Sequence, residues 1–403
     1  MKPGRSKRDP TPSTASLVGG IIADDLTGAA ELAGVALRYH LGAEVHSGAD
    51  GPFEAAVASL DTDSREVSAP EAARRVTQAA QYLGARRPAW VYKKVDSVLR
   101  GSVLAELHAA RLALRCRRVL LVPANPSLGR VIKRGCYYVG RHLLHKTSFR
   151  HDPKHPCLSS RVLAILGTGR SEILSLCRPG QSLPERGIII GAASTREDLL
   201  AWASQLDDTT LPAGAAEFFA AVLETKGYRP CTCPPPSSQV WPGKGRTLFV
   251  CGSASEATRS FLRRCGRLGL PVFSLPPQLR CAASPADGLV GQWAADAARA
   301  FKPHARVVLA INNPLLADPL APRRLCDQLV AAASAVLQQA RVSDLCVEGG
   351  ATAAALLHSM GWTRLAVIRE LSPGVVTMRP AANTTVKVTL KPGSYAWPEE
   401  LWV

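Results

Sequence analysis

The stretch from Ile21 to Glu31, IIADDLTGAAE, decides the fold of this chain. A short apolar run ends at two adjacent aspartates, a Thr-Gly step follows, and an alanine-rich segment comes next, which is the order of a strand, a turn and a helix start. In open α/β sheets, ligands bind beyond the carboxyl ends of parallel strands, where the next helix presents free N–H groups. Asp24, Asp25 and Thr27 are therefore predicted to stand at a binding site. The alternative is that one of the two aspartates only caps the helix with a side-chain oxygen.

The rest of the chain repeats this alternation of strand-length apolar runs and helix-length amphipathic segments, which favours βα units and mainly parallel sheets. In the first half we expect strands at 18–23, 55–60, 89–92, 118–122 and 187–191, and helices at 28–39, 69–83, 103–114 and 195–205. In the second half we expect strands at 247–251, 306–311, 345–347 and 385–390, and helices at 256–268, 323–340 and 352–360.

The predicted fold class is α/β, with two α/β domains, mainly parallel sheets and an active site in the cleft between the domains. The 403 residues exceed one typical domain. A Pro-rich stretch, 228–245, is interpreted as the linker, because it cannot sustain a helix or a central strand. It separates an N-terminal domain, 17–227, from a C-terminal domain, 246–403. The basic residues 1–16 are expected to form a disordered tail.

The composition is that of an ordinary soluble protein, with 46% hydrophobic and 20% charged residues. No apolar run approaches the roughly 18 residues that span a bilayer, and the basic N-terminus lacks the apolar segment of a signal peptide or anchor. Eleven cysteines in mostly apolar surroundings predict buried free thiols and fit a reducing cytoplasm. The pair Cys231 and Cys233 has no second pair or histidines at zinc spacing, so no metal site is predicted from protein ligands.

A net charge of +17 raises nucleic acid as a partner. Aromatic residues make up only 5% of the chain, however, and the arginines are scattered singly or in pairs. Without a stacking platform or a recognisable binding module, the charge is better explained by anionic small-molecule ligands. Neither a nucleic acid nor a membrane partner is expected.

Three more predicted strands of the first half end in polar clusters: DTDSR at 61–65, KKVDSVLRGS at 93–102, and PANPSLGR at 123–130. Helix capping needs only one such residue per helix, whereas a binding crevice explains all four strand ends together.

The side chains in these clusters indicate a small polyhydroxy acid as ligand. Cationic side chains could hold its carboxylate, and carboxylates and hydroxyls could bind its hydroxyl groups; the cations are Lys94, Arg65 and Arg100, and the others are Asp25, Asp96, Ser64 and Ser97. The alternative is a buried ion pair between Lys93 or Lys94 and Asp96 that only fixes the strand end.

The second half has three glycine-bearing turns after predicted strands, CGSAS at 251–255, EGGAT at 348–352 and KPGS at 391–394. Backbone N–H groups at such turns make concave anion sites that suit nucleotide phosphates. None of the three matches the GK[ST] phosphate loop or the GxGxxG dinucleotide fingerprint.

Taken in order, these motifs resemble the four-carbon acid sugar kinase family over nearly the whole chain, 17–402: ADDLTGA at 23–29, DTDSR, KKVDSVLRG, PANPSLGR, CGSAS, GGAT and KPGS. The resemblance implies an N-terminal acid-sugar-binding domain, a C-terminal nucleotide-binding domain, and ATP-dependent phosphorylation of an acid such as threonate, erythronate or a 3-oxo-tetronate.

The resemblance also implies site residues. The acid-sugar site falls on Asp24, Asp25, Thr27, Lys94, Asp96, Ser97 and Arg100, and the ATP site on Ser253, Gly349, Gly350, Thr352 and Gly393. The chain departs from the family pattern at Val98 and Ser102, at Ala351, where an acidic residue is common, and at KPGSYAW, where a KxGxFG-type ending is common. These departures leave the exact substrate open.

Phosphoryl transfer requires an acceptor hydroxyl in line with the γ-phosphate, neutralisation of charge, and a carboxylate that accepts the hydroxyl proton. Asp25 or Asp96 could supply that carboxylate, with Lys94 or Arg100 offsetting charge and Mg²⁺ bridging the phosphates. Two other classes remain open: a different sugar-acid enzyme such as a dehydrogenase, and a non-catalytic binding protein. The acid, the hydroxyl that reacts and the oligomeric state are also open, with a homodimer as one option.

Overall fold

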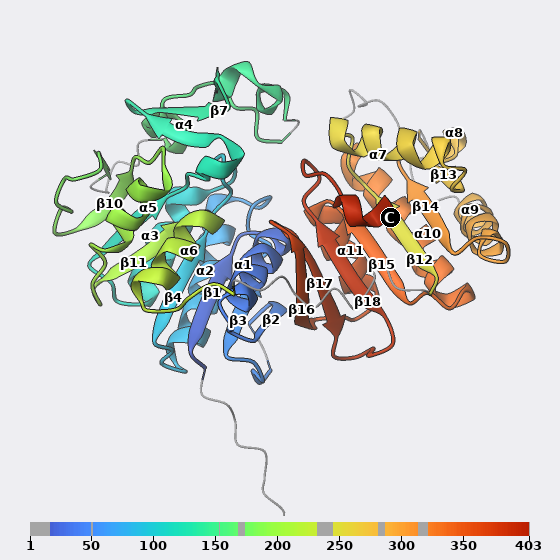
Figure 1. Ribbon diagram of the computed structural model, residues 1–403, viewed down its shortest axis with the longest axis horizontal. Helices are drawn as coiled ribbons and strands as arrows, with labels where there is room; N and C mark the ends of the chain where they lie inside the picture. Colours follow the sequence, from blue (N-terminus) through green and yellow to red (C-terminus); the bar gives the residue numbers. More distant parts are fainter. Residues whose placement is uncertain are drawn as a thin grey trace, which may run out of the picture.

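The computed structural model describes residues 17–49, 51–152, 154–167, 174–231, 245–280, 287–312 and 321–402. They form one sheet of fifteen strands, covered by helices, and a separate sheet of three strands (Figure 1). The expected tail at 1–16 and most of the expected linker, 232–244, lie outside the described residues.

The first half contributes the strands at one end of the large sheet, in the order β2-β3-β1-β4-β11-β5-β10-β9, and all neighbours in this series are parallel. These strands are β1 (Gly19–Ala23), β2 (Ala43–Ser47), β3 (Val57–Asp61), β4 (Trp90–Lys94), β5 (Arg118–Val122), β9 (Leu174–Cys177), β10 (Gly187–Gly191) and β11 (Thr210–Gly214). The helices are α1 (Leu26–Arg38), α2 (Ala69–Gly84), α3 (Val103–Ala113), α5 (Arg196–Ala203) and α6 (Ala216–Thr225).

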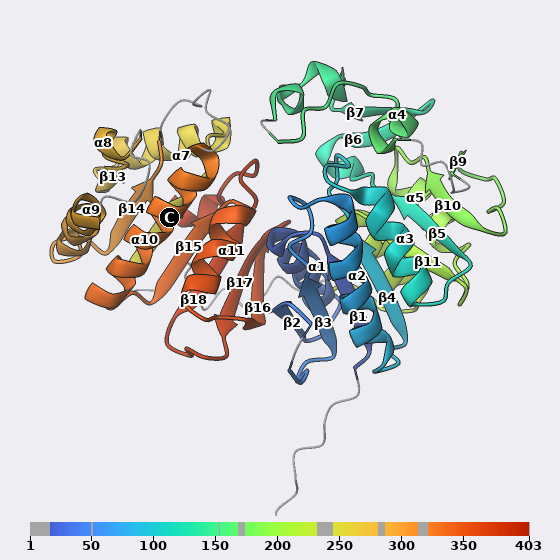
Figure 2. The same ribbon diagram turned by 180° about the vertical axis from the view of Figure 1, so that it is seen from behind.

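Alternation along β1 explains how helices cover both faces of this half, since successive side chains of a strand point to opposite faces. Ile21 belongs to the hydrophobic cluster that includes α1 and α6, whereas its neighbour Ile22 belongs to the cluster that includes α2 and α3. Figure 2 shows α2 and α3 on the face turned towards the reader. The strands are consequently buried on both sides, as their nearly continuous apolar sequences require.

The second half contributes the strands β13-β14-β12-β15-β18-β17-β16 at the other end of the sheet. Their bounds are β12 (Thr247–Cys251), β13 (Val272–Ser274), β14 (Arg306–Ala310), β15 (Asp344–Glu348), β16 (Arg364–Ser372), β17 (Val375–Pro380) and β18 (Lys387–Lys391). The helices are α7 (Glu256–Arg267), α8 (Pro277–Arg280), α9 (Asp287–Ala300), α10 (Ala321–Gln339) and α11 (Gly350–Ser359). Among the described strands of this large sheet, only the pairs that involve β16 or β17 are antiparallel.

The two halves are joined at β2 and β16, which pair in antiparallel fashion with Leu365 opposite Val45 (Figure 1). Helix α1 crosses this junction and contacts β16 and β17 as well as β2 and β3. A Cβ at Gly34 would lie 2.8 Å from Val376, so only glycine lets α1 approach β17 this closely. One hydrophobic cluster therefore continues from one half into the other.

A small antiparallel sheet projects beyond β5 and consists of β6 (Arg130–Lys133), β7 (Cys136–Val139) and β8 (His142–Leu143). The 3₁₀ turn η1 (Pro126–Leu128) leads into it, and η2 (Leu144–Lys146), η3 (Ser148–His151) and α4 (Val162–Leu166) complete this lobe. The last 3₁₀ turn of the chain is η4 (Glu399–Trp402). None of the helices that the structure describes has the length and apolar character needed to traverse a membrane.

The predicted α/β class with mainly parallel strands is confirmed, and every predicted strand and helix is present with small shifts of its ends. The continuity of the sheet across the two halves was not predicted. Three of the strands that were not predicted, β2, β11 and β16, carry charged residues or a proline that interrupt the apolar pattern. Strand β2 buries the pair Glu44 and His46, β11 contains Pro212, and β16 contains Arg369 and Glu370.

Candidate active site at the junction of the two halves

Two hollows lie beside each other at the carboxyl ends of the central strands. The small pocket has a volume of about 60 Å³ and is lined by Asp25, Thr27, Gly28, Glu31, Arg65, Lys94, Asp96, Ser97, Val98, Arg100, Arg130, Phe149, Pro392, Ser394 and Tyr395. The large cleft has a volume of about 1040 Å³ and includes Asp61, Asp63, Asp152, Lys154, Ser253, Arg323 and Thr352 among its lining residues. Both hollows are lined by residues from the two halves of the chain.

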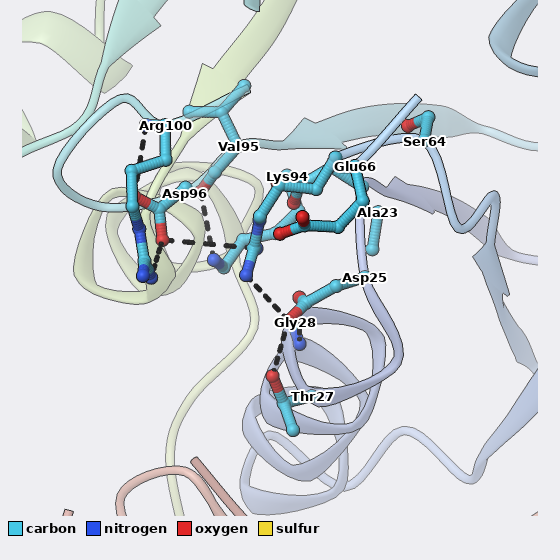
Figure 3. Close-up of polar contacts among 12 residues, drawn as sticks. Ala23, Asp25, Thr27, Gly28, Ser64, Glu66, Lys94, Val95, Asp96 and Arg100 are labelled. Carbon is cyan, nitrogen blue, oxygen red and sulfur yellow. Dashed lines mark hydrogen bonds and ion pairs between the residues drawn. The ribbon is translucent and has the colours of Figure 1, made fainter. Parts of the chain in front are cut away.

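Asp25 lies at the start of α1, where its extended backbone makes it the N-cap (Figure 3). Its Oδ1 accepts a hydrogen bond of 2.8 Å from the Gly28 backbone, so the capping alternative is correct as a description of one oxygen. Its Oδ2 accepts from Thr27 Oγ1 at 2.6 Å and from Arg65 at 2.8 Å. The side chain nevertheless lines the small pocket, and capping therefore holds a site residue in place.

Burial opposes ionisation of Asp25, yet the positive charges of Arg65 and Lys94 lower its pKa overall. The hydrogen bonds from Thr27 and Gly28 act in the same direction. Asp25 is therefore an ionised carboxylate at neutral pH.

Arg65 ties the first two strand ends together. Its Nε donates to Asp24 Oδ2 at 2.7 Å, while its NH1 donates to Asp25. Asp24 is almost fully buried and does not line the small pocket, and its Oδ1 has no hydrogen-bond partner among the described residues. Arg65 lines the small pocket, but its ion pairs with Asp24 and Asp25 leave fewer of its N–H groups for the expected ligand carboxylate.

Asp96 is saturated by the loop that follows β4. Its Oδ2 accepts from the backbone N–H groups of Val98 and Arg100 at 3.1 Å each, and its Oδ1 accepts from the Arg100 guanidinium at 2.8 Å. Burial opposes ionisation, but Arg100 and Arg65 hold the pKa of Asp96 well below its ordinary value. Arg100 also bonds to Asp152 at 3.0 Å, which links the small pocket to a residue of the large cleft.

The two lysines at the end of β4 have different partners. Lys93 is fully buried and pairs with Glu106 of α3 at 2.7 Å. Lys94 lines the small pocket and lies 3.5 Å from Glu31 of α1. The alternative of an ion pair between either lysine and Asp96 is therefore replaced by these two pairs, and only Lys94 faces the site.

The two predicted serines are placed differently. Ser64 is fully buried, donates to Glu106 at 2.8 Å, shares a hydrogen bond with Thr62, and does not line the small pocket. Its observed contacts organise the strand ends rather than a ligand. Ser97 does line the pocket and accepts a short hydrogen bond from Arg130.

The C-terminal motif after β18 reaches across to the small pocket. Lys391 is fully buried, pairs with Glu348 at 3.3 Å, and donates to the carbonyl of Tyr395 at 2.5 Å. These bonds hold the loop so that Tyr395 lines the pocket, where its hydroxyl lies 3.4 Å from Glu31. The KPGSYAW ending therefore delivers an aromatic side chain from the second half to a pocket built mostly from the first.

The three glycine turns of the second half converge. A Cβ added at Gly252 would collide with the Thr352 hydroxyl, and one added at Gly393 would lie 2.9 Å from Ser253 Oγ. Gly349 has a φ of 96°, which favours glycine, and it directly precedes α11. Residues predicted from three separate motifs thus form one surface, from which Ser253 and Thr352 line the large cleft.

The start of α11 lies directly against the start of α1. A Cβ at Gly350 would be 2.9 Å from Asp25 Oδ2 and 3.3 Å from Thr27 Oγ1. Asp25 is consequently the point at which the small pocket meets the glycine turns of the second half.

Asp61, which the sequence placed in a polar cluster without a role, ends β3 and lines the large cleft. It is 5% exposed, and no basic side chain among the described residues forms an ion pair with it. Burial raises its pKa well above the ordinary value, and Asp25 and Asp63 add to this effect. Its place directly after a predicted strand could have identified Asp61 as a candidate site residue.

Eight residues that line the small pocket were absent from the candidate site: Gly28, Glu31, Val98, Arg130, Phe149, Pro392, Ser394 and Tyr395. Glu31 lies one helical turn after Thr27 in an alanine-rich segment, and helical spacing from Thr27 could have revealed it. Phe149 and Tyr395 come from segments without a predicted strand or helix, so no periodic signal pointed to them.

Comparison with known proteins gives matches to two domain families. Residues 19–218 match the sugar-binding N-terminal domain, and residues 248–395 match the nucleotide-binding C-terminal domain. A D-threonate kinase of Cupriavidus necator is 29% identical over 95% of this chain and 96% of that protein. A 3-oxo-tetronate kinase of the same organism is 27% identical over 94% of each chain. A solved Haemophilus influenzae protein shares the fold, with 19% identity and a TM-score of 0.68 over 94% of this chain and 98% of that one.

The order of the two matched domains is the order that the motifs predicted, and the relatives are similar over nearly their whole length. The chain therefore belongs to the four-carbon acid sugar kinase family.

Proposed function

We propose that this protein transfers the γ-phosphoryl group of ATP to a hydroxyl of a four-carbon sugar acid of the threonate, erythronate or 3-oxo-tetronate class. One observation carries the proposal: Asp25 lies in the small pocket and at the same time against Gly350 of the glycine turn before α11. A carboxylate at this junction lies between the acceptor hydroxyl in the small pocket and the glycine turns that would bind the phosphates, and it can accept the hydroxyl proton there.

The linings of the two hollows support separate parts for them. The small pocket is lined mainly by charged and polar side chains, which suit a small polyhydroxy acid, whereas the large cleft, about 1040 Å³, has room for a nucleotide. We accordingly assign acid binding to an N-terminal domain, 17–227, and nucleotide binding to a C-terminal domain, 246–403. The convergent turns at Ser253, Gly349 and Gly393 would receive the phosphates.

In the transfer step, the acceptor hydroxyl oxygen forms a bond to the γ-phosphorus while the bond from that phosphorus to the β,γ-bridging oxygen breaks. The hydroxyl proton passes to Asp25, and the products are ADP and the phosphorylated acid. Asp25 suits this part better than Asp96, because Asp96 accepts four hydrogen bonds from its own loop and Arg100, whereas Asp25 accepts three and lies against Gly350 of the second half. Lys94 would offset negative charge beside the reacting oxygen.

Mg²⁺, which supplies charge neutralisation for phosphates in such reactions, fits the cleft next to Asp61. A buried carboxylate without a basic partner among the described residues is a suitable ligand for a cation.

The test is a screen of ADP release by the full chain with ATP and a panel of sugar acids of three to five carbons. We expect one four-carbon acid to be favoured by kcat/KM over its three- and five-carbon analogues by about 10-fold or more, since one extra or missing carbon changes pocket binding by that order. ADP release that is independent of every acid would overturn the proposal. Acid-dependent reduction of a nicotinamide cofactor would favour a dehydrogenase instead.

A further inference from the structure

The small pocket contains four cationic side chains, and three of them form ion pairs with carboxylates of the protein. Arg65 pairs with Asp24 and Asp25 at 2.7 and 2.8 Å. Arg100 pairs with Asp96 and Asp152 at 2.8 and 3.0 Å. Lys94 lies 3.5 Å from Glu31.

Arg130 is the fourth cation, and it differs from the others. It lines the small pocket but forms no ion pair with any carboxylate in the part of the chain that the structure describes. One of its N–H groups donates to Ser97 Oγ. A guanidinium has five N–H donors in a planar fork, so most of them are left for a ligand.

The position of Arg130 is fixed before any ligand arrives. It begins β6, and its backbone exchanges hydrogen bonds of 2.8 and 3.0 Å with Asn125, which closes the turn of residues 125–130. Gly129, with a φ of 67°, allows this turn. Because this turn is already closed, its backbone loses little conformational entropy when a ligand binds.

Two aromatic rings and one serine lie around the guanidinium group of Arg130. Its carbon lies 5.9 Å from the centre of the Phe149 ring and 5.8 Å from that of the Tyr395 ring. Ser97, which accepts from Arg130, has its own carbonyl held by the Tyr137 hydroxyl. Both distances are within the range of a cation–π contact, so the two rings help to hold the guanidinium at the wall of the pocket.

We infer that Arg130 is the residue that binds the carboxylate of the sugar acid and thereby makes the enzyme selective for acids over uncharged polyols. This inference rests on the proposed function for the class of ligand, and it replaces Lys94, Arg65 and Arg100, which the sequence had favoured for the same task. Bidentate pairing of a guanidinium with a carboxylate supplies both the charge and the orientation that place one hydroxyl at Asp25. Ser97 acts on the substrate through Arg130 and is a positioning residue.

The experiment compares Arg130→Met, which keeps the unbranched stem and removes the charge, with Arg130→Lys, which keeps the charge and removes the fork. Arg141→Met is the matched control, because Arg141 is an exposed arginine of the same lobe, in the turn between β7 and β8. Binding of D-threonate, D-erythronate and their uncharged primary amides is measured by calorimetry, and KM for acid and for ATP by steady-state kinetics.

We expect Arg130→Met to weaken binding of the acid and raise its KM by about 10- to 100-fold, the loss associated with a charge-assisted hydrogen-bonded pair, with little change in KM for ATP. The preference for the acid over its amide should vanish in Arg130→Met, be partly retained in Arg130→Lys, and be intact in Arg141→Met. A merely structural Arg130 would lower the melting temperature without changing that preference.

A folded Arg130→Met protein that keeps the wild-type preference for acid over amide would overturn the inference, as would an increase confined to KM for ATP. The proposed function fails separately, if the wild-type protein binds an acid in a manner that depends on Arg130 but transfers no phosphoryl group to it. Wild-type protein that binds no four-carbon acid of the threonate, erythronate or 3-oxo-tetronate class would overturn both.

Discussion

At the scale of single residues, Asp25 and Asp96 differ in their surroundings, and this difference decides which of them is proposed as the base. Asp25 shares one oxygen between Thr27 and Arg65 and faces the start of α11, whereas Asp96 is enclosed by its own loop and Arg100. Both have lowered pKa values, so both are ionised at neutral pH. Position, and not charge state, separates their parts.

We predict that Asp25→Asn lowers kcat by about 10² or more, the usual contribution of a positioned proton acceptor. KM for both substrates should change much less. Asp96→Asn is expected to act mainly through Arg100 and to lower the melting temperature, because it removes one partner of a buried pair. Steady-state kinetics and thermal melts of the two variants measure both effects.

The reverse pattern, with wild-type kcat in a folded Asp25→Asn protein and a large loss of kcat in Asp96→Asn, would transfer the base to Asp96. Normal kcat in both variants would mean that positioning and metal alone drive the reaction.

Seven of the fifteen residues that line the small pocket were predicted, because they lie at or just after the ends of strands, where a parallel sheet gathers its ligands. Asp25, Lys94 and Asp96 are of this kind. Their pairing was not predictable, because partners such as Arg65 and Asp25 are 40 residues apart and the geometry of the turns decides which charges meet. For the same reason the sequence could not tell that Arg65 and Arg100 form ion pairs with carboxylates of the protein, whereas Arg130 forms none among the described residues.

At the scale of secondary-structure elements, the start of α11 is the part of the second half that lies against Asp25, the proposed base. Gly350 has no side chain, and the space that a Cβ would fill is occupied by Asp25 Oδ2 at 2.9 Å. The helix can therefore direct its free N–H groups to the junction of the pocket and the cleft only when its first residue is glycine.

Gly350→Ala is predicted to lower kcat/KM by about 10-fold or more, since a displacement of a reacting group by less than an ångström has effects of this order. Stability should change little, because alanine is the better helix former. Gly291→Ala is the matched control, since Gly291 lies in α9 with open space around the position of its Cβ. Kinetics equal to wild type in Gly350→Ala would show that the close approach of α11 to Asp25 is not needed for turnover.

The elements themselves were predicted best where apolar runs are long and uninterrupted. Strands β5, β10 and β12 have the predicted bounds, because each is buried on both faces and reads as a continuous apolar segment. Strands β2 and β16 were missed because they carry charged residues at the junction of the halves, where neighbouring elements and not the strand's own pattern determine pairing.

At the scale of the whole molecule, the two halves form a single continuous sheet. Antiparallel pairing of β16 with β2 and the passage of α1 across the junction create one hydrophobic cluster through both halves (Figure 1). The small pocket depends on this arrangement, because Tyr395 reaches it from the second half. Sequence patterns report on local periodicity and could not reveal a contact between segments more than three hundred residues apart.

The proposed reaction takes place where the small pocket meets the large cleft, and it transfers a phosphoryl group from bound ATP to a bound sugar acid. The most direct measurement is ³¹P NMR of the full chain incubated with ATP, Mg²⁺ and the preferred four-carbon acid. The account predicts that the γ-phosphate signal of ATP is replaced, in equal amounts, by the signals of ADP and of a phosphate monoester coupled to a carbon-bound proton of the acid. Formation of ADP with inorganic phosphate alone would contradict it.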